Sequence, residues 1–175
     1  MRKKTLQNNT LRFWLVLSLI ILSFSLKKRN KKEWLLIYLL NAVSNGFIDM
    51  IIVKNHIVKF PIRLLPKIFN INILFDFFVY PTITVVYNQM SYYDKPLTSL
   101  YKLLFVSIPM LLIEYWLEAK TDLIEWRRGW KWYHTYTSIV IKSLLERLLV
   151  GKIREVRSND TLRSEHAYQG VTKDY

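Results

Sequence analysis

Cysteine is absent from the chain, and glycine and histidine are scarce, with 4 and 3 copies. Without cysteine, disulfides, iron–sulfur clusters, thiolate zinc sites and cysteine nucleophiles are excluded. The sequence also contains no glycine-rich phosphate loop, no nucleophile elbow and no paired-histidine zinc helix. It therefore predicts no catalytic residues, no metal site and no cofactor, and an enzyme is the less favoured class.

Long apolar runs are what the sequence has instead. Hydrophobic residues make up 51% of the 175 residues, yet the formal charge is +13. The apolar residues gather in five runs, and most Lys and Arg lie between them: Leu11–Leu26, Trp34–Val53, Ile68–Asn88, Leu103–Leu117 and Trp132–Val150. Because a bilayer core about 30 Å thick needs roughly 20 helical residues, we expect an all-α integral membrane bundle of about five transmembrane helices.

The first run is short for a membrane span. As a helix, Leu11–Leu26 would reach only about 24 Å. It spans if Arg12, Lys27 and Lys28 extend to the headgroups or if the lipid thins, and otherwise it lies in the interface. The start of the chain resembles a signal peptide, but it lacks a small-x-small cleavage site and is followed by "KKRNKK". We expect an uncleaved anchor.

Aromatic and basic residues flank the apolar runs. Trp and Tyr at the edges, with Lys or Arg just beyond, are typical of a membrane interface and argue against a soluble helical protein: Trp14, Trp34, Tyr92, Tyr93, Tyr115, Trp116, Trp126, Trp130 and Trp132. Basic residues occur in every connecting segment rather than on one face. This distribution favours an anionic lipid bilayer, and other membrane proteins, as partners over nucleic acid.

Three regions follow along the chain. Residues 1–33 form a basic N-terminus with a short hydrophobic anchor helix, and residues 34–150 form a four-helix membrane core with a polar interior. Residues 151–175 form a polar tail that we expect to be poorly ordered. The loop 54–67 is expected in the headgroup region, and residues 118–132 are expected to form one or two amphipathic turns anchored by Trp126 and Trp130.

Polar side chains recur every four residues in the apolar runs, which places them on one helix face. The three clearest stripes and one sparser face are Asn41, Asn45 and Asp49; Asn72, Asp76, Tyr80 and Thr84; His134, Ser138, Lys142 and Glu146; and Ser107, Glu114 and Glu118. Such stripes cannot be satisfied by lipid, so they must face each other or a wet cavity. The candidate intramembrane polar site comprises Asn45, Asp49, Asn72, Asp76, Glu114, His134, Lys142 and Glu146.

Asp76 is the costliest member of this set. It lies about 12 Å into its run, where an isolated Asp costs about 2.5–3.5 kcal/mol. It must be protonated or paired with a buried cation. Lys142 is the one basic residue at comparable depth and is the preferred partner, with Glu146 competing for it one turn away. Asp49 and Glu114 lie nearer to helix ends.

Proline and glycine mark two further positions. Pro81 and Pro109 each remove an intrahelical hydrogen bond, freeing the carbonyls of Phe77 and Phe105. Interrupted helices beside ionisable groups recur in transporter cores, although proline is also frequent in ordinary membrane helices. Ala42 and Gly46 form a small-x-x-x-small pair that predicts close helix packing.

The phrases "LFD", "IEYW", "P-x-R-L-L-P", "FID" and "GW-x-WYHT" lie between residues 34 and 140. In them the chain resembles an uncharacterised family of small polytopic membrane proteins from spore-forming Gram-positive bacteria. The resemblance implies a membrane protein and marks seven family-type positions without implying an activity: Asp49, Arg63, Asp76, Glu114, Trp130, Trp132 and His134.

These observations predict a multi-pass protein of the bacterial cytoplasmic membrane. The leading hypothesis is a non-enzymatic membrane component whose polar stripes mediate helix packing. The alternative is a small transporter or an ion- or proton-conducting subunit, with Asp76 as the titrating group. The third hypothesis is a membrane-embedded enzyme that acts on lipid or peptide.

Overall fold

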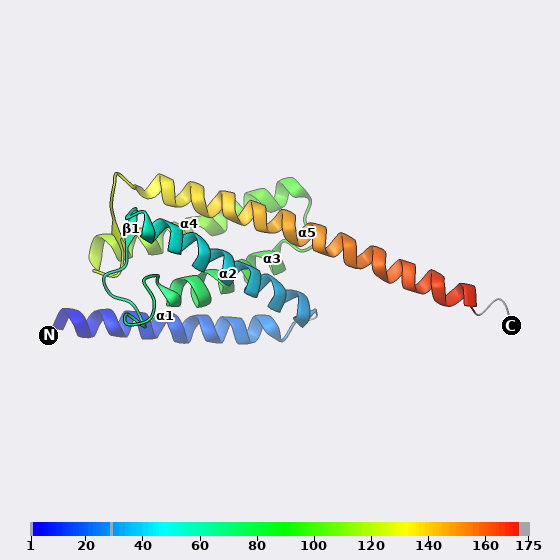
Figure 1. The fold of residues 1–175 in the computed structure, drawn as a ribbon, viewed down its shortest axis with the longest axis horizontal. Coiled ribbons are helices and arrows are strands. Elements are labelled where there is room, and N and C mark those ends of the chain that lie inside the picture. The colour runs from blue at the N-terminus through cyan, green and yellow to red at the C-terminus, as the bar shows by residue number, and fades with distance from the viewer. Residues whose placement is uncertain (1, 29, 172–175) are drawn as a thin grey trace. The chain divides into compact units, whose positions relative to one another are not determined.

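The computed structural model describes residues 2–28 and 30–171, with side chains for 7–28 and 30–155. Among the described residues the regular elements are helices and one pair of two-residue strands, joined by loops (Figure 1). The elements in chain order are α1 (Arg2–Leu26), α2 (Lys31–Lys54), β1 (Val58–Lys59), the π-helix η1 (Phe75–Val79), α3 (Tyr80–Met90), α4 (Pro96–Lys120), β2 (Glu125–Trp126) and α5 (Trp132–Val171).

Within the described part of the chain, three helical segments are long and apolar enough to cross a bilayer, namely Gln7–Leu26, Lys31–Lys54 and Pro96–Lys120. The all-α class is confirmed, and these segments support a membrane protein. The third apolar run differs from the sequence prediction, because residues 68–72 are not helical. Pro61 and Pro66 lie just before this segment, and neither can donate a helical hydrogen bond. The run becomes helical after Asn72, whose carbonyl accepts the amides of Phe75 and Asp76, both at 3.0 Å.

The chain divides into two compact units, Met1–Ser143 and Leu144–Tyr175. The division falls within α5, so the predicted membrane core, which was placed at 34–150, spans both units. Within the predicted polar tail, residues 151–175, α5 continues through Val171, and residues 172–175 lie outside the described part of the chain.

Helix α2 packs against η1 and α3 in the first unit, and α1 packs against α2, η1 and α3. One face of α2 is buried, and its residues recur singly or in adjacent pairs every three or four positions: Trp34, Ile37, Asn41, Ala42, Asn45 and Gly46. The opposite face is apolar and open, since Val43 is 66% exposed and Phe47 is 65% exposed. A helix that is polar inside and apolar outside is suited to lipid rather than water.

Pro81 shapes the junction of η1 and α3. The amide of Tyr80 bonds to the carbonyl of Phe75, five residues back, and Pro81 has no amide to give. Helix α2 donates hydrogen bonds to two carbonyls of η1. Asn45 Nδ2 donates to the carbonyl of Asp76 at 3.1 Å, and Tyr38 Oη donates to the carbonyl of Phe77 at 2.5 Å. The carbonyl of Phe77, which was predicted to lack the amide of Pro81, therefore accepts a hydrogen bond from a neighbouring helix.

Two connecting loops meet at one end of the first unit. Strands β1 and β2 pair antiparallel, with Val58 opposite Trp126 and Lys59 opposite Glu125. The predicted amphipathic turns of residues 118–132 are therefore wrong in part, because this loop pairs with the loop after α2. The two loops bury Phe60, Leu123 and Ile124 against α1, η1 and α4, and this burial stabilises the ribbon.

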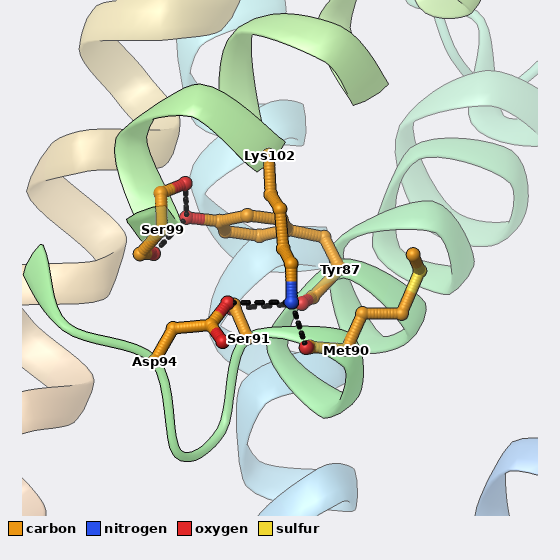
Figure 2. A network of polar contacts seen from close by, with 6 residues as sticks. All are labelled: Tyr87, Met90, Ser91, Asp94, Ser99 and Lys102. Atoms are coloured by element: carbon orange, nitrogen blue, oxygen red, sulfur yellow. Dashed lines mark hydrogen bonds and ion pairs between the residues drawn. The ribbon is translucent and has the colours of Figure 1, made fainter. Parts of the chain in front are cut away.

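Opposite ends of the helices are joined by different contacts. Gln7 of α1 donates to Asp122 Oδ2 at 2.7 Å, at the end that carries β1 and β2. At the other end, Gln89 of α3 donates to the carbonyl of Ser25 at 2.9 Å. The turn between α3 and α4 is fixed by Lys102, which bonds to the carbonyl of Met90 at 2.9 Å and pairs with Asp94 at 2.7 Å (Figure 2).

Close packing of α2 on η1 depends on Gly46. A Cβ atom at this position would lie 3.0 Å from Phe77 Cζ, whereas a Cβ at Gly151 would have no heavy atom within 4 Å. We expect Gly46→Leu to push α2 away from η1 and to lower the free energy of unfolding by about 1–3 kcal/mol. Gly151→Leu is the matched control and should unfold like the unmodified protein. Thermal unfolding in detergent measures both, and equal midpoints would contradict the packing role.

Candidate functional site: an interior polar cluster

An amide ladder runs along the inner face of α2. Asn45 Nδ2 donates to Asn41 Oδ1 at 2.7 Å, and Asn41 Nδ2 donates to Thr84 Oγ1 of α3 at 2.9 Å. All three residues are buried. Asn41 and Asn45 reach each other because side chains four apart are neighbours on a helix. The ladder joins α2 to α3 through groups that the lipid could not satisfy.

Two carboxyl groups meet one turn further along α2. The side chain of Asp49 lies close enough to the side chain of Asp76 from η1 for the two carboxyl groups to interact. Asp76 is 2% exposed. Two carboxylates that share a buried site repel each other, and a proton on one of them removes this repulsion. The predicted stripes of the second and third apolar runs therefore do face each other.

Lys142 of α5 places its own ammonium group beside Asn45 and the two aspartates. Its Nζ donates a hydrogen bond to Asn45 Oδ1. It also attracts Asp49 and Asp76 electrostatically. Asp76 was the predicted partner of Lys142, with Glu146 competing for the lysine. In the structure the lysine bonds directly to Asn45, and its charge acts on both aspartates.

Glu114 of α4 joins the cluster from another side. Its Oε2 accepts from Tyr80 Oη at 3.1 Å and its Oε1 accepts from Thr135 Oγ1 at 3.2 Å. Trp130 Nε1 donates to Thr135 Oγ1 at 2.9 Å. Glu114 also interacts electrostatically with Asp49 and Asp76.

Three acids thus share one interior region. We call Asn41, Asn45, Asp49, Asp76, Tyr80, Thr84, Glu114, Thr135 and Lys142 the interior polar cluster.

Thr135 is the member that the sequence analysis missed. The predicted stripe of the fifth run began at His134 and included Ser138, but Ser138 is exposed and Thr135 is 3% exposed. Thr135 and Lys142 are seven residues apart, which also places them on one helix face. The signal was therefore present in the sequence as a seven-residue spacing.

Three other predicted site residues have different surroundings. His134 Nδ1 accepts the amide of Lys131 at 3.1 Å, and its ring stacks on Trp130 at 5.2 Å between centroids. Asn72 is fully buried at the start of the helix that contains η1, and its side-chain amide has no hydrogen-bond partner among the described residues. Glu146 lies in the second unit, four residues after Lys142.

The chemistry open to the cluster is limited by its composition. Within the described residues, no group of three His, Asp or Glu side chains is arranged to hold a metal ion. The cluster offers carboxyl groups, amides, hydroxyls and one amine. These groups bond helices together and exchange protons. Comparison with protein-family models, curated proteins and solved structures finds no match to this chain.

Asn45 is the connecting residue of the cluster, because it bonds to Asn41, to the carbonyl of Asp76 and to Lys142. We expect Asn45→Ala to lower the free energy of unfolding by about 2–4 kcal/mol, since it leaves buried polar groups without partners. Ser44→Ala is the control, because the hydroxyl of Ser44 bonds to Leu40 within its own helix. Denaturant titration in detergent compares them. Equal losses would show that the cluster does not hold the helices.

Proposed function

We propose that the chain is a multi-pass integral membrane protein of a bacterial cytoplasmic membrane and acts as a non-enzymatic membrane component. The observation that carries this proposal is the interior polar cluster, which draws groups from α2, η1, α3, α4 and α5 into one bonded network. Inside a bilayer such groups must be satisfied by the protein itself, and their pairing fastens the helices.

The outward surface of the first unit supports membrane insertion. Large apolar side chains are open along three helices: Phe24 and Val43 are each 66% exposed, and Phe105 is 74% exposed. Soluble monomers rarely present apolar patches of more than a few hundred Å². The surface and the interior are therefore both matched to lipid rather than to water.

Five crossings are part of the proposal. Besides the three long apolar helices, η1 and α3 form a continuous helical stretch of 5 and 11 residues, and α5 begins with an apolar segment. Contacts at the two ends support alternating helix directions. Gln7 meets Asp122 at one end, and Ser25 meets Gln89 at the other. We also retain, as a proposal, the resemblance to small polytopic proteins of spore-forming bacteria.

The absence of native cysteine makes the topology testable by single-cysteine labelling. Five crossings place Lys28→Cys and Tyr93→Cys on one side of the membrane and Arg128→Cys on the other. If only the three long helices cross, Tyr93→Cys moves to the opposite side from Lys28→Cys, and Arg128→Cys joins Lys28→Cys. A membrane-impermeant maleimide applied to intact spheroplasts distinguishes these patterns. Release of the protein by alkaline carbonate would contradict membrane insertion altogether.

A second candidate function, proton exchange across the membrane, is favoured by the Asp49–Asp76 contact. Helix packing alone is served by neutral amides such as Asn41 and Asn45. The cluster instead holds three carboxyl groups against one lysine, and two of the carboxyl groups interact directly with each other. Intramembrane carboxyl groups in contact with one another are typical of proton relays in pumps and transporters.

This second function predicts that Asp76→Asn abolishes proton flux. The amide keeps the size and hydrogen-bonding capacity of the carboxyl group but does not exchange its proton at neutral pH. Flux of purified protein in vesicles, driven by a pH gradient, should fall to the level of empty vesicles. Asp94→Asn, which alters only the ion pair with Lys102 near the surface, is the control and should retain flux. Unmodified protein that conducts no more than empty vesicles would exclude proton transport.

A further inference from the structure

An apolar cavity of about 570 Å³ lies between the early part of α1 and the late part of α4. Its lining is Asn9, Thr10, Phe13, Trp14, Leu112, Ile113 and Trp116. The volume is within the range of small-molecule sites, about 300–1,000 Å³. The cavity is open toward the outer surface, since Phe13 is 60% exposed and Leu112 is 58% exposed. None of its lining residues belongs to the interior polar cluster.

The lining changes from polar to apolar with depth. Asn9 and Thr10 lie nearest the start of the span Gln7–Leu26, and Trp116 lies nearest the end of the span Pro96–Lys120. Phe13 lies one turn deeper along α1, and Leu112 lies one turn deeper along α4. The bond between Gln7 and Asp122 places both of these helix ends together. The cavity therefore has a polar mouth at the membrane interface and an apolar interior beneath it.

A basic side chain lies beside the mouth. Lys120 is exposed and follows Trp116 by four residues on the same face of α4. Cations at the interface attract anionic lipid headgroups at about 1 kcal/mol each. An apolar cavity beneath a basic, aromatic mouth has the polarity of a phospholipid, with its headgroup outside and its chain inside.

We propose that this cavity binds one acyl chain of an anionic phospholipid, whose headgroup lies beside Lys120. The inference rests on the proposed membrane insertion. In a bilayer a gap between two helices does not stay empty, because the surrounding lipid is the nearest apolar molecule. The occupant stabilises the contact between α1 and the rest of the bundle in the way that any ligand of the folded state does.

Photo-cross-linking in detergent tests the site. Purified full-length protein is titrated with phosphatidylglycerol or phosphatidylcholine that carries a diazirine in one acyl chain, and the labelled peptides are mapped by mass spectrometry. We expect saturable labelling, with about one phosphatidylglycerol per chain, at residues 9–14 and 112–116. Leu112→Trp should fill the cavity and reduce this labelling at least fivefold. Val43→Trp adds the same ring to an exposed position on α2 and should leave the labelling unchanged.

The headgroup is tested with a variant that leaves the packing intact. Lys120→Gln should raise the half-saturating concentration of phosphatidylglycerol several-fold and leave that of phosphatidylcholine unchanged. Equal half-saturation by the two lipids in the unmodified protein overturns the anionic assignment. Unsaturable labelling spread over the apolar faces of α2 and α4, or unreduced labelling in Leu112→Trp, overturns the site. Extraction by carbonate would instead defeat the proposed function, so the two failures are distinguishable.

Discussion

The missing amide of Pro81 is the constraint on which the interior depends. It leaves a backbone carbonyl of η1 without its helical donor, in a region that we propose is closed to water. An unpaired carbonyl in an apolar medium costs several kcal/mol. Asn45 and Tyr38 of α2 remove this cost by donating to the carbonyls of Asp76 and Phe77. Helix α2 must therefore lie against η1 in one rotation, and Gly46 leaves the space for it.

The rest of the cluster follows from that rotation. Asn41, Asn45 and Asp49 are four residues apart, so fixing Asn45 against η1 also turns Asn41 toward Thr84 and Asp49 toward Asp76. The acids then attract Lys142 from α5, and Tyr80 carries the network to Glu114 on α4. A single backbone defect, made by one proline, thus determines which side chains of four other segments come together.

The sequence predicted those parts of this arrangement that depend only on the spacing of residues within one helix. The stripes of α2 and of η1 with α3 follow from local spacing, as does the freed carbonyl of Phe77. The parts that it did not predict depend on partners. Thr135 rather than His134 faces Glu114 because of how α5 meets α4, and both residues fit a helical pattern. Strands β1 and β2 are two residues long and lie in separate loops, so neither has a periodicity to detect.

Packing and proton exchange are usually treated as competing explanations for buried acids, but in this cluster they depend on the same contact. If Asp49, Asp76 and Glu114 were all ionised, Lys142 would neutralise one charge and leave the other two repelling each other in a medium of low dielectric constant. Asp49 and Asp76 interact directly, and a proton on either of them would relieve this repulsion and let the two carboxyl groups bond between α2 and η1. Removing that proton would break a bond between the same two segments that Pro81 forces together. The charge of the cluster is therefore linked to the packing of its helices, and a change in one must alter the other.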